Sequence, residues 1–233
     1  MPELMFHDLQ FALRRLPYGV LKLLRDFPNK VFVGGGYIRA IIASEHINDI
    51  DLFVPSKDLG EAYATILAEG RKVYTTDNAF TITKTKPMVQ IIHRWTYETP
   101  SDLINSFDFT IAMGALWYDG GGWRSLCHER FYADLAAKRL HYTAPIRNED
   151  AGGSLLRVLK FYQRGYRIPL DSFGAVIARL VQAVRMDEIH DEKHLAKVLT
   201  GLLREVDPAI DPNHLAHLPA ENTELDVSEK PKE

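Results

Sequence analysis

Three consecutive glycines, residues 34–36, stand between a short apolar segment, residues 31–33, and a run with isoleucines at helical spacing, residues 37–42. Glycine adopts backbone conformations that other side chains block, so the triplet predicts a tight turn from a strand into a helix. A second β-type segment follows at residues 49–53. The chain therefore begins its main unit with strand, glycine turn, helix and strand, an order typical of proteins that mix helices with a sheet.

The second predicted strand carries two acidic residues. Asp49 and Asp51 are two positions apart, so their side chains point to one face while Ile50 and Leu52 point to the other. Two neighbouring carboxylates favour a hard cation, and Mg²⁺ usually completes its shell with water and substrate phosphates. The pair indicates a magnesium site for phosphoryl or nucleotidyl transfer, although an Asp-x-Asp alone is common in strands and loops.

The glycine turn supports the same interpretation. Bare backbone at Gly35 and Gly36 allows a triphosphate to approach closely, and NH groups at the start of a helix favour anions. Arg39 lies one turn into the helix and adds positive charge. A dinucleotide-binding turn is the rival interpretation, but its third glycine would fall where Arg39 stands. The three features together predict a site for a nucleoside triphosphate.

These residues resemble the first motif of the head domain of class II CCA-adding enzymes and bacterial poly(A) polymerases, in the DNA polymerase beta nucleotidyltransferase superfamily. The motif is approximately Gly-Gly-x-x-Arg-Asp followed by Asp-x-Asp. The matching residues are Gly35, Gly36, Arg39, Asp49 and Asp51. Ala40 replaces the aspartate after the arginine. The resemblance implies an α+β nucleotidyltransferase fold, a mixed sheet flanked by helices, followed by a small α-helical neck domain.

A second block of resemblance surrounds Asp108. The family motif Arg-Arg-Asp-Phe-Thr-x-Asn-Ala is matched at its centre by Asp108, Phe109 and Thr110. The paired arginines are absent, and Ala112 replaces the asparagine. Asp108 is therefore a third carboxylate near the metals, a ribose contact, or a loop aspartate that caps backbone NH groups. The family also carries an acidic residue near Gln90, so either Gln90 or Asp108 stands at the third-carboxylate position.

Residues 150–205 change character, because β-type alternation disappears and apolar residues recur at helical intervals. Further helices are predicted over 173–185 and 193–206. On the first helix of this part, Arg157 and Lys160 are either nucleotide or RNA backbone contacts or members of a solvated face. The family neck has an arginine three residues after its Glu-Asp pair, and this sequence does not, so the resemblance does not extend to CCA addition.

Composition limits the alternatives. A net charge of −3 gives no global attraction to nucleic acid, so any RNA contact needs a local patch. One cysteine excludes an internal disulfide, and neither a leader-like start nor an apolar run of the ~20 residues that span a bilayer is present. We expect a cytoplasmic protein with no membrane contact, composed of a head (residues 1–142), a neck-like part (143–206) and a flexible tail (207–233).

The expected activity is Mg²⁺-dependent transfer of a nucleoside monophosphate from a nucleoside triphosphate, ATP or CTP, to a hydroxyl acceptor. Asp49 and Asp51 would hold two Mg²⁺ ions, and Asp108 would complete the site. The expected nucleotide contacts are Gly35, Gly36, Arg39, Arg157 and Lys160. The resemblance implies the 3′ end of an RNA, tRNA-like, as acceptor. A protein or small-molecule acceptor, and a weakly active nucleotide-binding regulator of toxin–antitoxin type, are the alternatives.

Overall fold

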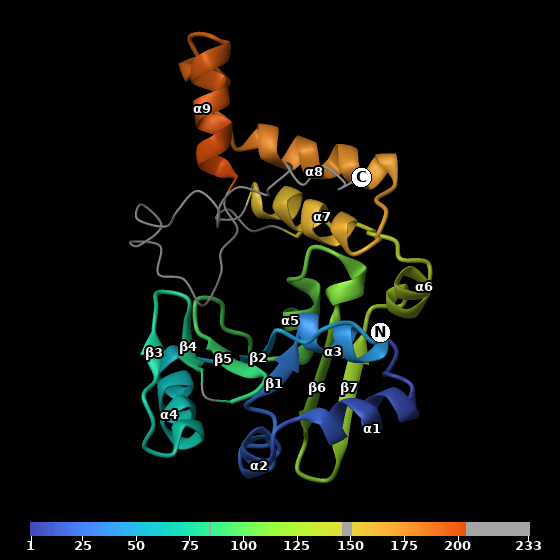
Figure 1. The fold of residues 1–233 in the computed structure, drawn as a ribbon, viewed down its shortest axis with the longest axis vertical. Coiled ribbons are helices and arrows are strands. Elements are labelled where there is room, and N and C mark those ends of the chain that lie inside the picture. The colour runs from blue at the N-terminus through green and yellow to red at the C-terminus, as the bar shows by residue number, and fades with distance from the viewer. Residues whose placement is uncertain (84, 146–150, 204–233) are drawn as a thin grey trace, which may run out of the picture.

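The computed structural model describes residues 1–83, 85–145 and 151–203. A seven-stranded sheet forms the centre of the head, and a helical part lies above one end of it (Figure 1). The strands are β1 (Phe32–Gly34), β2 (Asp49–Phe53), β3 (Tyr74–Thr75), β4 (Ala79–Ile82), β5 (Met88–Ile92), β6 (Gly114–Tyr118) and β7 (Trp123–Cys127). Their order in the sheet is β3-β4-β5-β2-β1-β6-β7. The predicted α+β class is confirmed.

The helices surround the sheet and build the neck-like part. They are α1 (Phe6–Arg15), α2 (Tyr18–Asp26), α3 (Gly36–Ile42), α4 (Lys57–Ala68), α5 (Pro100–Asn105), α6 (Phe131–Ala136), α7 (Gly153–Gln163), α8 (Leu170–Gln182) and α9 (Glu192–Leu202). Two short 3-10 turns, η1 (Thr110–Ala112) and η2 (Met186–Glu188), complete the described elements. No helix among the described residues is long and apolar enough to cross a membrane.

The sheet is mixed because one of its central pairs is parallel. β2 and β5 run parallel, whereas β1 pairs antiparallel with both β2 and β6. A parallel pair needs a long crossover connection, and here α4, β3 and β4 lie between β2 and β5 in the sequence. The central position of β1 and β2 places the glycine turn and both aspartates in the middle of the sheet, away from its edges.

The two faces of the sheet are covered differently. Ile50 and Leu52 of β2 are fully buried in the larger core, together with apolar side chains of α1 to α4. The opposite face packs Phe32 and Phe53 against Leu103 of α5 in a smaller cluster. Asp49 and Asp51 are half-buried on the same face as Phe53, because residues two apart on a strand share a face. The predicted alternation along β2 is confirmed.

The helical part packs against the head through one face of α7. Ser154, Val158 and Phe161 are buried, and they recur at the spacing of one helix face. Val158 and Phe161 belong to the same core cluster as Ile38 of α3. α8 lies alongside α7, and α9 projects away from the head (Figure 1). Glu149 and Asp150, which resemble the Glu-Asp pair of the family neck, and the predicted tail, residues 207–233, lie outside the described residues. The predicted domain boundaries remain predictions.

Candidate active site

The glycine turn needs glycine for two separate reasons. Gly35 has φ +70° and ψ −136°, a conformation that is essentially restricted to glycine. A Cβ atom on Gly34 would lie 3.2 Å from side-chain atoms of both Leu103 and Phe53, closer than ordinary packing allows. A Cβ atom on Gly35 would lie 3.6 Å from Asp51 Oδ2. The bare turn therefore lies directly against one of the two carboxylates.

The register of β1 and β2 brings the aspartates to this turn. Gly34 is the antiparallel partner of Asp51, so the carboxylate lies beside the residue at which the turn begins. Asp49 lies one repeat further from the core on the same face, and both side chains remain partly accessible. The structure thus places Asp51 against the glycine turn and Asp49 two positions along the same face of β2, and their joint role in a site remains a prediction.

The neighbour of Asp51 on the other side is Gln90. These residues are parallel partners on β2 and β5, so their side chains share a face of the sheet. Gln90 is 1% exposed, and its Oε1 has no hydrogen-bond partner among the described residues; the same holds for Oγ1 of its own neighbour, Thr81. A buried unpartnered carbonyl oxygen costs free energy. The position beside Asp51 thus carries a neutral amide whose buried oxygen has no partner among the described residues.

Asp108 lies between the head and α7. Its side chain is buried, and its Oδ2 accepts hydrogen bonds from Ser154 Oγ at 2.8 Å and from Arg157 Nε at 2.6 Å. Both donors come from α7, so this oxygen of Asp108 pairs with the helical part. Phe107, the preceding residue, packs against the glycine turn at Gly35. Asp108 therefore connects the site to α7 through a charge pair.

Arg39 lies beneath the turn and has its own carboxylate partner. It is 6% exposed, its Nε donates to Glu45 Oε2 at 3.1 Å, and its guanidinium lies 4.8 Å from the ring centroid of Phe161 in α7. The other carboxylate oxygen, Glu45 Oε1, accepts from Tyr166 Oη at 2.7 Å. Burial lowers the pKa of Arg39, which Glu45 partly offsets, and burial also raises the pKa of Tyr166. Arg39 thus ties α3 to the helical part.

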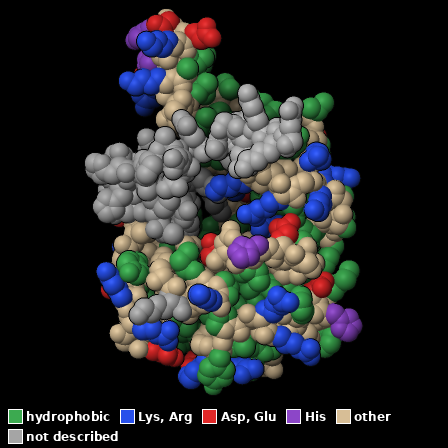
Figure 2. Space-filling view, in the orientation of Figure 1, with side chains coloured by type: hydrophobic (Ala, Val, Ile, Leu, Met, Phe, Trp, Pro, Cys, Tyr) green, Lys and Arg blue, Asp and Glu red, His purple; other side chains and the backbone are tan. Residues whose placement is uncertain are grey.

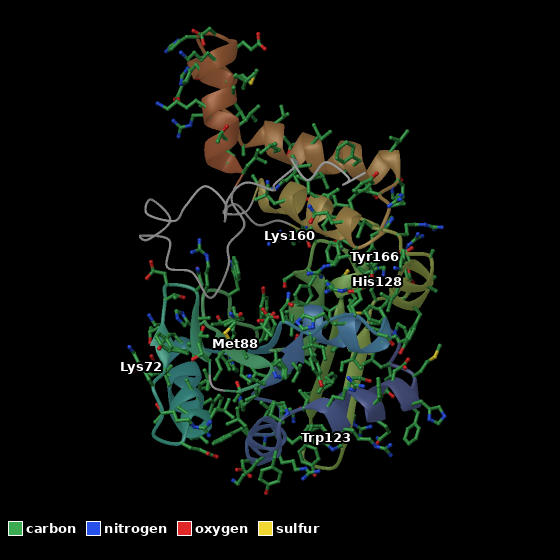
Figure 3. The ribbon with its side chains drawn as sticks, in the orientation of Figure 1. Lys72, Met88, Trp123, His128, Lys160 and Tyr166 are labelled. Carbon is green, nitrogen blue, oxygen red and sulfur yellow. The ribbon has the colours of Figure 1, made fainter. Side chains whose placement is uncertain are left out.

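The remaining predicted contacts lie on α7. Arg157 pairs with Asp108 and its side chain is 23% exposed. Lys160 is exposed, and in Figure 3 it lies on the side of α7 that faces the sheet. Met88, labelled in the same view, is the register partner of Asp49. The structure therefore brings Asp51 to the glycine turn, with Asp49 on the same face of β2, and it places Arg39, Asp108 and Arg157 in the joint between head and α7.

The donor set suits a magnesium ion that shares its ligands with a substrate. Asp49 and Asp51 offer carboxylate oxygens, and Gln90 adds an amide oxygen beside them. Within residues 1–83, 85–145 and 151–203, no group of three His, Cys, Asp or Glu side chains could hold a metal by itself. Mg²⁺ bound by one or two carboxylates relies on water and phosphate for the rest of its shell. The residues therefore fit Mg²⁺ delivered with a nucleotide.

Solved structures with a similar fold are CCA-adding enzymes. The CCA-adding enzyme of Thermotoga maritima in complex with tRNA has a TM-score of 0.57 and 19% identity, and the match covers 85% of this chain and 50% of that chain. A CCA-adding enzyme in complex with CTP matches with a TM-score of 0.57 and 20% identity, and one in complex with ATP with a TM-score of 0.56 and 20% identity, over the same shares of each chain. At these identities the likeness shows the fold, and the chain has a nucleotidyltransferase-like fold.

Sequence comparison gives the family. The family model described as Gabija anti-defense 2 family protein matches residues 10–138, more than half of the chain. The chain therefore belongs to this family. A curated relative, Gabija anti-defense 2 of Bacillus phage SPbetaL7, is 27% identical over 154 residues, which are 64% of this chain and 37% of the relative. The chain thus spans about a third of that relative and half of the CCA-adding enzymes. The expected nucleotidyltransferase-like fold is confirmed, while the family is Gabija anti-defense 2 and not class II CCA-adding enzymes.

Proposed function

We propose that this protein is a Mg²⁺-dependent nucleotidyltransferase that moves a nucleoside monophosphate from a nucleoside triphosphate to a hydroxyl acceptor. The observation that carries the proposal is the position of Asp51 Oδ2, 3.6 Å from where a Cβ atom on Gly35 would lie. A carboxylate that close to a bare turn allows one bound triphosphate to meet both the backbone and a metal ligand.

In the proposed reaction the triphosphate lies over Gly35 and Gly36, with its phosphates next to Asp49 and Asp51. The acceptor oxygen forms a bond to the α-phosphorus, the bond to pyrophosphate breaks, and the acceptor proton passes to solvent. Two bound Mg²⁺ ions would lower the pKa of the acceptor hydroxyl and neutralise the leaving pyrophosphate. The two aspartates would hold these ions, and Gln90 lies beside Asp51 in the sheet.

The buried charge pairs act on the site indirectly. Arg39 and Asp108 are both engaged with partners in or next to the helical part, so we propose that they position the glycine turn and α7. Arg157 belongs to the same joint. Lys160, exposed on the side of α7 toward the sheet, is the residue of this set that we propose to meet the nucleotide directly.

The solved structures with a similar fold support a choice of nucleotide and acceptor. CCA-adding enzymes were solved with ATP, with CTP and with tRNA, so we propose ATP or CTP as donor and an RNA 3′ end as acceptor. A protein or small-molecule acceptor, or a regulator that binds a nucleotide with little turnover, remains the alternative. The name of the phage relative adds a proposed context: action against the Gabija defence inside the bacterial cytoplasm.

The test is transfer of label. The protein is incubated with each α-³²P-labelled nucleoside triphosphate, MgCl₂ and total bacterial RNA, and the products are separated into RNA, protein and small molecules. We expect label in RNA that disappears in Asp49→Asn and Asp51→Asn and persists in the matched control Asp58→Asn, an exposed aspartate of α4. Label in protein would favour the alternative acceptor. Labelling that both site variants retain would contradict the assignment.

A further inference from the structure

The chain segments that follow α6 and α7 meet and gather four cations. Lys138 and Arg139 follow α6, and Arg164 and Arg167 follow α7. Arg167 N–H donates to Lys138 O at 2.8 Å, Leu140 N–H donates to Arg167 O at 2.8 Å, and Arg139 and Arg167 form a parallel bridge. These four cations are called the basic seam below. Figure 2 shows Lys and Arg side chains gathered where the helical part meets the head.

The charge of this region departs from that of the chain. The described stretches 135–145 and 151–170 contain six Lys and Arg and no Asp or Glu, whereas the whole chain has 31 acidic and 28 basic residues. Among the described residues, the carboxylate in ion-pair range of the seam is Asp134, whose Oδ1 lies 3.8 Å from Arg139 Nη1, and Arg130 already pairs with it. The seam therefore carries an excess of positive charge.

Local carbonyls offset part of this excess. Lys138 Nζ donates to Arg164 O at 3.5 Å, at the C-cap of α7, and Arg167 Nη1 donates to Tyr166 O at 3.0 Å, in the segment after the helix. Cations at the C-terminus of a helix are favourable, but one helix end supplies only about half an elementary charge. The four cations are exposed and keep an excess of positive charge that a polyanion can neutralise. A nucleic acid gains from this contact, because its condensed counterions are released when Lys and Arg neutralise its phosphates.

An exposed aromatic ring belongs to the same surface. Tyr162 is 58% exposed, and the Arg167 guanidinium lies 4.7 Å from its ring centroid. Surfaces that bind single strands combine basic groups along the backbone with aromatic rings on which unpaired bases stack. A duplex keeps its bases stacked inside, and an acidic protein offers none. The exposed ring of Tyr162 therefore favours a single-stranded nucleic acid over a duplex and over an acidic protein as the partner of this surface.

We propose that the basic seam binds the backbone of a single-stranded nucleic acid, with Tyr162 stacking on one of its bases. The role of this strand as acceptor of the transfer rests on the proposed function. Its binding to the basic seam needs neither metal nor nucleotide. Tyr166 lies between the two regions: Lys138 Nζ is 5.9 Å from its ring centroid, and its Oη donates to Glu45, the partner of Arg39. The seam is thus connected by direct contacts to the residue beneath the glycine turn.

Fluorescence anisotropy of a labelled 20-nucleotide RNA, without Mg²⁺ or nucleotide, measures this binding as a function of salt. In Arg139→Glu/Arg167→Glu we expect an affinity loss of about tenfold or more, and a salt slope smaller by about 1.4 for two lost phosphate contacts. Tyr162→Ala should weaken the single strand by about tenfold while leaving binding of a duplex unchanged. Circular dichroism verifies that each variant is folded.

The matched control is Arg14→Glu/Lys30→Glu, which changes the net charge equally at two exposed positions of the head. Equal losses in the seam variant and the control would overturn the proposal, as would poly-glutamate or duplex DNA that binds as tightly as the single strand. Asp51→Asn separates the two proposals, because it should abolish transfer and keep strand binding. Strand binding without any transfer would contradict the proposed function and support the seam.

Discussion

Arg157 and Asp108 join α7 to the head through an ion pair, with Nε of the arginine 2.6 Å from Oδ2 of the aspartate. Asp108 directly follows Phe107, which packs against Gly35. Two adjacent residues therefore contact both regions: Asp108 pairs with α7, and Phe107 packs against the glycine turn. The contribution of this ion pair can be tested by removing one of its members.

Arg157→Ala leaves the buried Asp108 carboxylate without its charged donor. We expect the free energy of unfolding to fall by ~1.5–3 kcal/mol, since hydrogen bonds to charged groups contribute about that much. Urea unfolding followed by circular dichroism measures the change. Arg71→Ala is the control, because Arg71 and Glu69 form an exposed pair whose loss should cost under about 1 kcal/mol. Equal effects in both variants would show that the pair does not fix α7.

Gly35→Ala forces a Cβ atom into a positive-φ conformation. The expected destabilisation is about 1–3 kcal/mol, and nucleotide binding should be lost with it. The same substitution at Gly174, in the interior of α8 with no heavy atom within 4 Å of an added Cβ, should stabilise the protein by about 0.5–1 kcal/mol. Opposite signs of the two shifts in thermal unfolding support the strained turn; the same sign would argue against it.

Gln90→Glu places a third carboxylate beside Asp51. Without metal the variant should melt below the wild type, because a like charge is added at a buried position. With MgCl₂ its melting temperature should rise more than that of the wild type, since the added oxygen binds the ion preferentially in the folded state. Gln163→Glu, exposed at the end of α7, is the control. A magnesium effect no larger than in the wild type would place the ion elsewhere.

Cys127 is buried in β7, and burial raises the pKa of its thiol to about 11. The thiolate is the reactive form, so iodoacetamide at pH 8 should modify the folded protein far more slowly than the urea-unfolded protein. The raised pKa also means that this thiol contributes stability below its ordinary pKa near 9, which is lost as pH rises toward 11. Rapid modification of the folded protein at pH 8 would contradict the burial.

Short-range patterns predicted the centre of this fold. The alternation along β2 and the glycine triplet each depend on residues within a few positions, so the face of Asp49 and Asp51 and the turn at Gly35 followed from sequence alone. The helix predicted over 173–185 begins earlier, at Leu170, because Pro169 directly precedes it and presets an extended N-cap. Such shifts at helix ends change little in the site.

Long-range partners could not be predicted in the same way. Arg39 was expected at the nucleotide and Asp108 at the metals or the ribose, yet each pairs with a partly buried residue: Glu45 lies beyond the end of α3, and Arg157 lies 49 positions away on α7. Tyr166 completes the first pair from even further along the chain. No local spacing marks the contacts of Arg157 and Tyr166, because they form only when the helical part packs on the head.

The central claim is that Asp49, Asp51 and the glycine turn together bind a divalent ion and a nucleotide. Electron paramagnetic resonance of Mn²⁺, titrated into the protein with ATP or CTP, tests it directly, because free and bound Mn²⁺ give different signals. We predict tight Mn²⁺ binding that requires the nucleotide and is lost in Asp51→Asn, while Asp58→Asn binds like the wild type. Binding that Asp51→Asn retains, or a wild type that binds no Mn²⁺ with either nucleotide, would contradict the account.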